Sequence, residues 1–414
     1  MRMAKLLIIG YVWPEPTSSA AGQHMMDIIL PFHQSGWHIT FATPAAESKN
    51  KFDLAAMGID EKVIELNSST FDSWLMQLQP DVVIFDRFMM EEQFGWRVSR
   101  VSPDALKILD TEDLHFLRRA RQKTQTAAGK LVDIDLNSQE TLREIASIYR
   151  CDLTLIISHE EIRMLTAAFS VDEALLHYYP VLVHGIAERL LPFDERANFV
   201  FVGTMRHAPN LDAVRRLKKN LWPNIRKRLP EASLYIIGSY ATDEITQMHQ
   251  PASGFHVLGY VKDLQQVLRQ SRVMLAPLQF GAGIKGKLLE SMQYGLPSVT
   301  TAIGAEGIAS HDQWPGTVAE NDEQFIDAAI SLYQDKPGWQ SAQKRGAEIL
   351  ESKFLYADHA SLLVQRVENL MEKLIEHRKE NFIGQMLNLN NMKSTEYMSR
   401  WIECKNKNSR ESGS

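Results

Sequence analysis

Residues 276–292 read APLQFGAGIKGKLLESM and pass from an apolar, strand-like run through a glycine-containing loop into a helix. Gly281 and Gly283 allow backbone amides to come close to a ligand. The helix that follows offers unpaired N–H groups and the positive end of its dipole. Lys285 and Lys287 add positive charge in a first turn, where helices favour acidic residues. The segment therefore predicts an anion site, at which a bound diphosphate would offset the cost of the lysines.

Glu290 stands on the same predicted helix, three residues after Lys287, so the two side chains share a face. Its carboxylate could accept hydrogen bonds from the two hydroxyls of a ribose beside the phosphates. The alternative is a surface ion pair between Lys287 and Glu290, with glycines that merely turn the chain. A Walker loop is excluded because no Gly-Lys-Ser/Thr ending is present, and the segment Ile9–Pro14 lacks the glycines of a dinucleotide fingerprint.

The alternation of strand and helix extends on both sides of this segment. Short β-rich runs alternate with helical stretches from Leu6 to Val183, and a second series starts at Phe199. This rhythm is typical of parallel sheets with helical crossovers. Residues 184–197 contain Gly and Pro without clear periodicity, which places a domain boundary there.

We therefore expect an α/β protein with two doubly wound, Rossmann-like domains that face each other across a cleft. The expected domains are 1–190, 197–355, and a C-terminal part, 356–414, of helices and a polar tail. The tail, 380–414, is rich in Asn and is expected to fray. Open α/β sheets bind ligands at the carboxyl ends of their strands, so the ligand is expected in the cleft.

Composition narrows the function classes. The chain has 414 residues, 44% of them hydrophobic, and a net charge of −6, which argues against nucleic-acid binding. The two cysteines, Cys151 and Cys404, suggest neither a disulfide framework nor a zinc site. The N-terminal apolar run is too short for a signal sequence. These features predict a cytoplasmic protein.

Several motifs in the second half resemble those of retaining glycosyltransferases of family 4, with the GT-B fold (glycosyl transferases group 1). The resemblance covers residues 199–308 and is carried by the segment quoted above together with Phe201–Gly203, Pro209–Ala213, Trp222–Pro223, Pro230, Ile237–Gly238, Leu258–Asp263 and Tyr294–Thr301. It implies that this half holds a nucleoside diphosphate sugar. Lys285 and Lys287 would then lie near the diphosphate, Glu290 on the ribose, and the amides around Gly281 and Gly283 near the sugar or phosphate.

The sequence departs from the family pattern at two places. Ala282 stands where the family often has a Glu that touches the donor sugar. His207 and Asn210 stand near the place of a common Arg and Lys pair. The resemblance thus implies that Lys285 and Lys287 carry the positive charge instead, while no donor-sugar contact can be copied from the family.

The first half resembles an acceptor domain more weakly, through Trp13–Pro16 and a helix opened by Ala20-Ala21-Gly22. Gly22 would let an acceptor or the donor phosphate sit against a helix N-terminus. The alternative is a flexible helix start.

A group of acids and a histidine, Asp110 to His115, follows the strand predicted at Lys107–Leu109. Such a position faces the cleft, so Asp113 and His115 could orient or deprotonate an acceptor hydroxyl, or contact the donor sugar. The alternative is N-capping of the next helix by Asp110 or Asp113, with His115 packed. Two further pairs of charged residues after the preceding strand are expected to form surface ion pairs: Asp86-Arg87 and Glu91-Glu92.

Together these features predict a glycosyltransferase that moves a hexosyl unit from a nucleoside diphosphate sugar to an acceptor hydroxyl, with retention. We expect no metal and no cofactor other than the donor substrate. The acceptor could be a glycan, a lipid-linked sugar, a protein or a small molecule; no nucleic acid is expected, and peripheral membrane contact stays open. The alternatives are a sugar-nucleotide 2-epimerase of GT-B build and a non-catalytic nucleotide- or sugar-binding module.

Overall fold

Two parallel sheets organise the chain in the computed structural model, which describes residues 3–124, 134–390 and 392–411. The first sheet has seven strands in the order β3-β2-β1-β4-β5-β6-β7. The strand order reverses beside β1, as in other doubly wound folds. Its strands are β1 (Lys5–Ile9), β2 (His38–Thr43), β3 (Asp60–Val63), β4 (Val82–Asp86), β5 (Leu106–Asp110), β6 (Leu153–Ile156) and β7 (Leu176–Tyr178).

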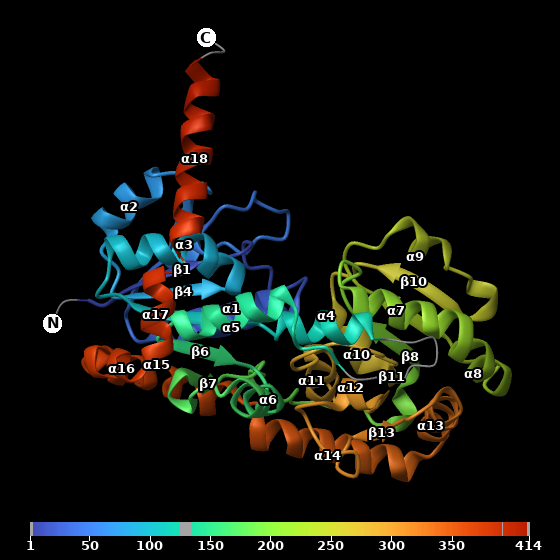
Figure 1. The fold of residues 1–414 in the computed structure, drawn as a ribbon. Coiled ribbons are helices and arrows are strands. Elements are labelled where there is room, and N and C mark those ends of the chain that lie inside the picture. Colours follow the sequence, from blue (N-terminus) through green and yellow to red (C-terminus); the bar gives the residue numbers. More distant parts are fainter. Residues whose placement is uncertain (1–2, 125–133, 391, 412–414) are drawn as a thin grey trace.

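The second sheet has six parallel strands in the order β10-β9-β8-β11-β12-β13. Its strands are β8 (Ala197–Val202), β9 (Leu234–Ile237), β10 (Phe255–Gly259), β11 (Ser271–Ala276), β12 (Ser298–Thr300) and β13 (Gly316–Val318). The sheets belong to the two halves seen side by side in Figure 1. The expectation of two doubly wound, Rossmann-like domains is confirmed.

Helices cover both faces of the first sheet, because its central strands are apolar on both sides. Leu6 and Ile8 of β1 pack in one cluster with α1, whereas Leu7 and Ile9 pack in another with α2 to α6. This is the alternation that a pleated strand imposes. The helices are α1 (Ala20–Gln34), α2 (Thr70–Leu78), α3 (Phe88–Val101), α4 (His115–Lys123), α5 (Gln139–Arg150) and α6 (His159–Phe169).

The second sheet is likewise buried between two apolar clusters, one with α7, α8 and α13 and the other with α10, α11 and α14. Trp222, Trp314 and Trp339 are fully buried in these layers. The helices are α7 (Ala208–Arg216), α8 (Trp222–Arg228), α9 (Asp243–Gln247), α10 (Leu264–Gln270), α11 (Gly286–Gln293), α12 (Ala302–Ala305), α13 (Asp322–Gln334) and α14 (Lys336–Lys353).

The C-terminal part returns to the first domain (Figure 1). Its helices are α15 (Tyr356–Glu372), α16 (Leu374–Glu380), α17 (Phe382–Asn390) and α18 (Met392–Glu411). Leu363 and Val367 of α15 join the cluster beneath the first sheet, against α1.

The expectation of a frayed polar tail is wrong for α17 and α18. Helix α17 packs against α5 and α18 against α3, where Arg97 donates a hydrogen bond to Ser399 at 2.9 Å. Some polar residues of these helices, Ser399 and Glu396 among them, therefore pair with the first domain. No helix in the described ranges is long and apolar enough to cross a lipid bilayer.

Candidate active site

The glycine loop before α11 lies against the first domain. Gly281 and Gly283 have φ angles of 152° and 60°, which L side chains rarely adopt. A Cβ at Gly283 would lie 2.6 Å from Ile157 Cδ1 and 3.0 Å from Asp113 Cβ, both of the first domain. Glycine is therefore required here for a close approach between domains as well as for the turn.

Hydrogen bonds from the first domain hold this loop. The Gly283 amide donates to Glu161 Oε1 at 2.9 Å, and Arg121 donates to the Gly281 carbonyl at 2.7 Å. Arg121 also makes a two-pronged ion pair with Glu306, both contacts at 2.6 Å. Burial raises the pKa of Glu161 to about 8. The Gly283 amide is thus engaged by Glu161 in this arrangement and is not free for a phosphate, contrary to expectation.

Lys285 is buried at the start of α11. Its Nζ donates to the Gly283 carbonyl at 2.8 Å and lies 3.6 Å from a Glu306 oxygen. Burial lowers the pKa of Lys285, although Glu306 opposes the shift. The side chain is therefore partly compensated and fixes the loop beside it.

Lys287 has no acidic partner among the residues the structure describes. Its Nζ donates to Asn210 Oδ1 and lies 4.6 Å from the centre of the Phe201 ring. Burial, together with the nearby charge of Lys285, lowers the pKa of Lys287 to about 7. An anion placed here would restore the charge of the ammonium group.

Glu290, one turn along α11, is equally uncompensated. Its side chain is partly buried and makes no hydrogen bond or ion pair within the described part of the chain. Burial raises its pKa to about 7. The alternative of a surface ion pair between Lys287 and Glu290 is wrong, and both groups are left to bind a ligand.

The start of α1 lies beside the start of α11. A Cβ at Gly286 would come 3.2 Å from Ala20 Cβ. Gly22 itself packs under the preceding loop, since a Cβ there would lie 2.4 Å from the Glu15 carbonyl carbon. Its amide donates to the N-cap Ser19 at 3.0 Å. Gly22 is therefore neither a flexible start nor a free donor, and its amide is already satisfied.

Asp113 lies at the cleft and is paired. Its carboxylate accepts from Arg118 at 2.6 Å, and His115 Nδ1 lies 3.4 Å from Asp113 Oδ1. Burial opposes ionisation of Asp113, but Arg118 and His115 outweigh it and the pKa is lowered. His115 is buried edge-on against Phe88, with 5.7 Å between ring centres. Asp113 is thus an anion that Arg118 holds in place, with the buried His115 ring beside it.

The alternative interpretation of this segment is wrong about the cap, although His115 is packed as it expected. The N-cap of α4 is Leu114, which makes no side-chain cap. Glu144 of α5 accepts instead from the amides of His115 and Phe116, at 3.1 and 2.9 Å. Sequence reasoning missed Glu144 because the cap comes from another helix.

His207 faces the same group from the second domain. Burial, together with the charge of Arg118, lowers its pKa to about 4. His207 also lies within electrostatic reach of Asp113 and Lys287. The cleft therefore brings Asp113 and Arg118 opposite His207 and Lys287, which no local spacing could have predicted.

The two pairs of charged residues that follow β4, Asp86-Arg87 and Glu91-Glu92, are not both at the surface. Glu91 is buried and paired with Arg150, and Asp86 is only 4% exposed, so the surface interpretation is wrong for these two acids. Glu92 forms the expected outer ion pair, with Arg143. Ala282 is buried in the apolar cluster of the first domain.

Comparisons with known proteins agree with this architecture. Residues 196–335 match the model of the family Glycosyl transferases group 1. Sucrose-phosphate synthase from Thermosynechococcus elongatus superposes with a TM-score of 0.69 at 12% identity, over 89% of this chain and 100% of that one. Anabaena HepE in complex with UDP and glucose gives 0.63 at 13%, also over 89% and 100%. No curated protein sequence matches the chain.

The structural matches have low identity and show the fold, which is GT-B. The family match covers most of the second domain, the half that carries Lys285, Lys287 and Glu290. The chain therefore has the GT-B fold with a segment, residues 196–335, that matches the glycosyl transferases group 1 model, and the expected enzyme class, a glycosyltransferase, is confirmed.

Proposed function

We propose that the protein transfers a hexosyl unit from a nucleoside diphosphate sugar to an acceptor hydroxyl, with retention of anomeric configuration. The observation that carries this proposal is the pair of uncompensated groups on α11, the Lys287 ammonium and the Glu290 carboxyl. A ligand that satisfies both needs an anionic part beside a pair of hydroxyls, as in a diphosphate joined to a ribose. Retention rests on the motif resemblance.

Charge on the leaving diphosphate would be stabilised by Lys287, by Lys285 and by the start of α11. That helix has no side-chain cap at its N-terminus, so its first amides keep their capacity for an anion. Donors fixed before the reaction stabilise developing charge without reorganisation. In this proposal the cationic side chains neutralise the diphosphate, and no metal is required at that position.

Asp113 suits a positioning role better than that of a base. A carboxylate with a lowered pKa is a weak proton acceptor, and Arg118 already holds both of its oxygens. It could orient an acceptor hydroxyl or a hydroxyl of the donor sugar. The contact between the glycine loop and the first domain would exclude water from the reacting bond and so limit hydrolysis of the donor.

The first test is calorimetric titration of UDP and GDP into the wild-type chain and Lys287→Ala. Loss of a charge-assisted hydrogen bond costs about 1.5–3 kcal/mol, so we expect affinity to fall by roughly 10- to 100-fold. Lys344→Ala is the control, because Lys344 pairs with Glu348 on the surface. Unchanged affinity in Lys287→Ala would contradict the phosphate assignment.

Ala282 motivates a second candidate, a non-catalytic binding module, since no acid stands at this donor-side position. Mass spectrometry of acceptor panels separates the two candidates, because only transfer adds the mass of the sugar to an acceptor. An epimerase would instead convert the donor without any acceptor. Nucleotide binding without transfer or slow donor hydrolysis would favour the binding module.

A further inference from the structure

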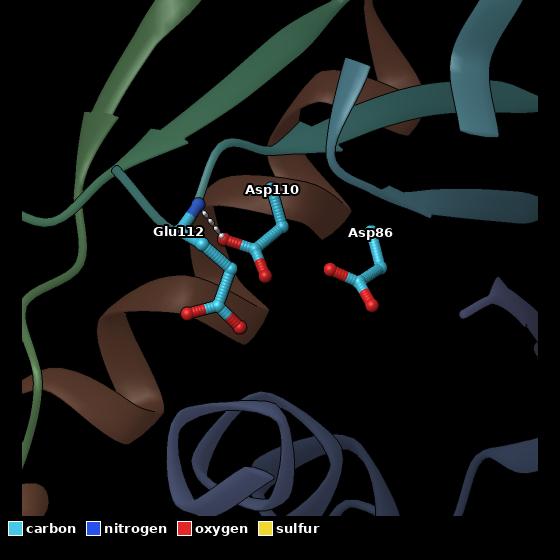
Figure 2. Close-up of side chains that lie close together, drawn as sticks. All are labelled: Asp86, Asp110 and Glu112. Atoms are coloured by element: carbon cyan, nitrogen blue, oxygen red, sulfur yellow. Dashed lines mark hydrogen bonds between the residues drawn. The ribbon is translucent and has the colours of Figure 1, made fainter. Parts of the chain in front are cut away.

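A separate group of side chains lies in the first domain, at the carboxyl ends of β4 and β5. Asp86 ends β4 and Asp110 ends β5, and the two residues are register partners in adjacent strands. Glu112 follows two residues after Asp110, and His24 comes from α1. Figure 2 shows the three carboxyl groups gathered at the strand ends, with Asp110 between the other two.

The carboxyl groups have the spacing of ligands around one ion. One oxygen from each of Asp86, Asp110 and Glu112 lies within 4.8 Å of the others. Oxygens bound to Ca²⁺ lie at about 2.3–2.6 Å from the ion, so two of them can be at most about 5 Å apart. The spacing therefore suits the larger divalent ions.

Each carboxyl group also keeps an oxygen for a ligand. The Tyr11 amide donates to Asp86 Oδ2 at 2.8 Å, and the Glu112 amide donates to Asp110 Oδ1 at 3.3 Å. The remaining oxygens, Asp86 Oδ1, Asp110 Oδ2 and Glu112 Oε1, are buried and make no hydrogen bond to the described residues, although Asp86 Oδ1 lies 3.7 Å from Arg87 Nε. Buried acceptors without partners lower the stability of the folded chain, so these oxygens are suited to bind a cation or a hydrogen-bond donor.

His24 is independent evidence for a ligand. Its side chain is 0% exposed, and neither ring nitrogen makes a hydrogen bond within the described chain. Its Nε2 points at the acids and lies 3.6 Å from Asp110 Oδ1, which is longer than a hydrogen bond. Neutral imidazole is a common ligand of divalent metals, so His24 offers one nitrogen beside the group of three oxygens.

The charges leave room for a divalent ion. Arg87 lies 3.7 Å from Asp86 and compensates one of the three carboxylates. Asp27 faces His24 from the same helix and is bound by His184 at 2.7 Å. Because Asp110 and His24 are fully buried, a sugar ring could not reach them both, whereas an ion could.

We propose that Asp86, Asp110, Glu112 and His24 form a site for a divalent cation such as Mn²⁺ or Ca²⁺. The ion neutralises the acids and fixes the turn that carries Asp113 into the cleft. Glu112 has a φ of 61° in that turn, which a non-glycine residue holds only under constraint. The proposed ligands differ from the residues assigned to the diphosphate, and the site departs from the sequence expectation of no metal.

The test uses the full chain, stripped with EDTA and titrated with MnCl₂ in the absence of nucleotide. We expect one Mn²⁺ per chain, a higher melting temperature with the ion, and ¹⁴N modulation from His24 in the pulsed EPR spectrum. Glu112→Gln should bind Mn²⁺ at least ten-fold more weakly. Glu92→Gln, which changes an outer acid paired with Arg143, should bind like the wild type.

Further measurements keep this test separate from that of the nucleotide site. Mn²⁺ binding should persist in Lys287→Ala, and Glu112→Gln should retain UDP affinity. The ¹⁴N signal is measured on the wild-type chain, so it does not depend on a variant that folds. Any one of three results would overturn the proposal: no saturable binding at millimolar Mn²⁺ or Ca²⁺, Mn²⁺ bound without the nitrogen signal, or Mn²⁺ bound by Glu112→Gln as tightly as by the wild type.

Discussion

The α11 segment and the acid cluster of the first domain are two polar sites with different origins. Lys285, Lys287 and Glu290 lie within one turn and a half of a single helix, so their spacing in the sequence already places them together. Asp86, Asp110, Glu112 and His24 come from two strand ends, a turn and a helix. The residues of the first site are close together in the sequence, whereas those of the second come together only when the sheet has formed.

The same contrast separates Gly283 from the other left-handed glycines. Gly283 has a positive φ and meets the first domain, whereas Gly36 has a φ of 75° with nothing within 4 Å of an added Cβ. Both substitutions to alanine cost backbone strain of about 1 kcal/mol. Gly283→Ala adds the clash with Ile157 and Asp113, so we expect a loss of roughly 2–4 kcal/mol in the free energy of unfolding.

Urea unfolding of Gly283→Ala and Gly36→Ala measures this difference directly. We also expect transfer by Gly283→Ala to fall by more than ten-fold, because the domains can no longer approach, and transfer by Gly36→Ala to stay near wild type. Equal stability losses in the two variants would mean that the contact between the glycine loop and the first domain does not form in solution.

Much of the architecture could be predicted from the sequence, because hydrophobic periodicity and glycine loops are local signals. The two sheets and the position of Glu290 on α11 follow from such patterns. The roles of Glu144, Glu161 and Arg121 could not be predicted, since each acts on a segment at least 28 residues away. The polar C-terminal helices were misjudged for the same reason: their partners lie in the first domain.

Glu290→Gln tests whether the buried carboxyl group on α11 lowers the free energy of unfolding. The pKa of Glu290 is raised from 4.5 to about 7 by burial, so the folded chain loses stability as pH rises through 7 and the group ionises. Gln carries no charge, so we expect the variant to be more stable at pH 8 by about 1–3 kcal/mol. At pH 5 we expect little difference.

The same variant should bind UDP roughly ten-fold more weakly, because a neutral amide accepts fewer and weaker hydrogen bonds from a ribose. Thermal unfolding at pH 5 and pH 8, combined with UDP titration, measures both effects. Glu320→Gln, an exposed acid of the same domain, is the control. A variant that is less stable at pH 8 would show that Glu290 has a partner in solution.

The lowered pKa of Lys287 predicts that nucleotide binding is linked to the uptake of a proton. Its pKa is lowered from 10.5 to about 7 in the free protein, and a bound diphosphate would raise it again. Above pH 7 nucleotide binding must therefore take up a proton, and affinity for UDP should fall by up to about ten-fold per pH unit between pH 7.5 and 8.5. The β-phosphate is ionised throughout that range, since such phosphates have a pKa of about 6.

Calorimetry in buffers of different ionisation enthalpy counts this proton. We expect close to one proton per UDP at pH 8.5 for the wild type and close to none for Lys287→Met. Proton uptake that is the same in both proteins would assign the linkage to another group.

The smallest expected effect concerns the distant cap of α4. Glu144 accepts from two backbone amides, at 3.1 and 2.9 Å, and an amide side chain offers one acceptor oxygen in place of two. Glu144→Gln should therefore lower the free energy of unfolding by about 1 kcal/mol and weaken the hold on His115 behind Asp113. Glu140→Gln, on the same helix, removes an ion pair with the exposed Arg119 and should cost less than about 0.5 kcal/mol. If the two variants unfold alike, the cap supplied by α5 contributes nothing, and the start of α4 is held by its own sequence after all.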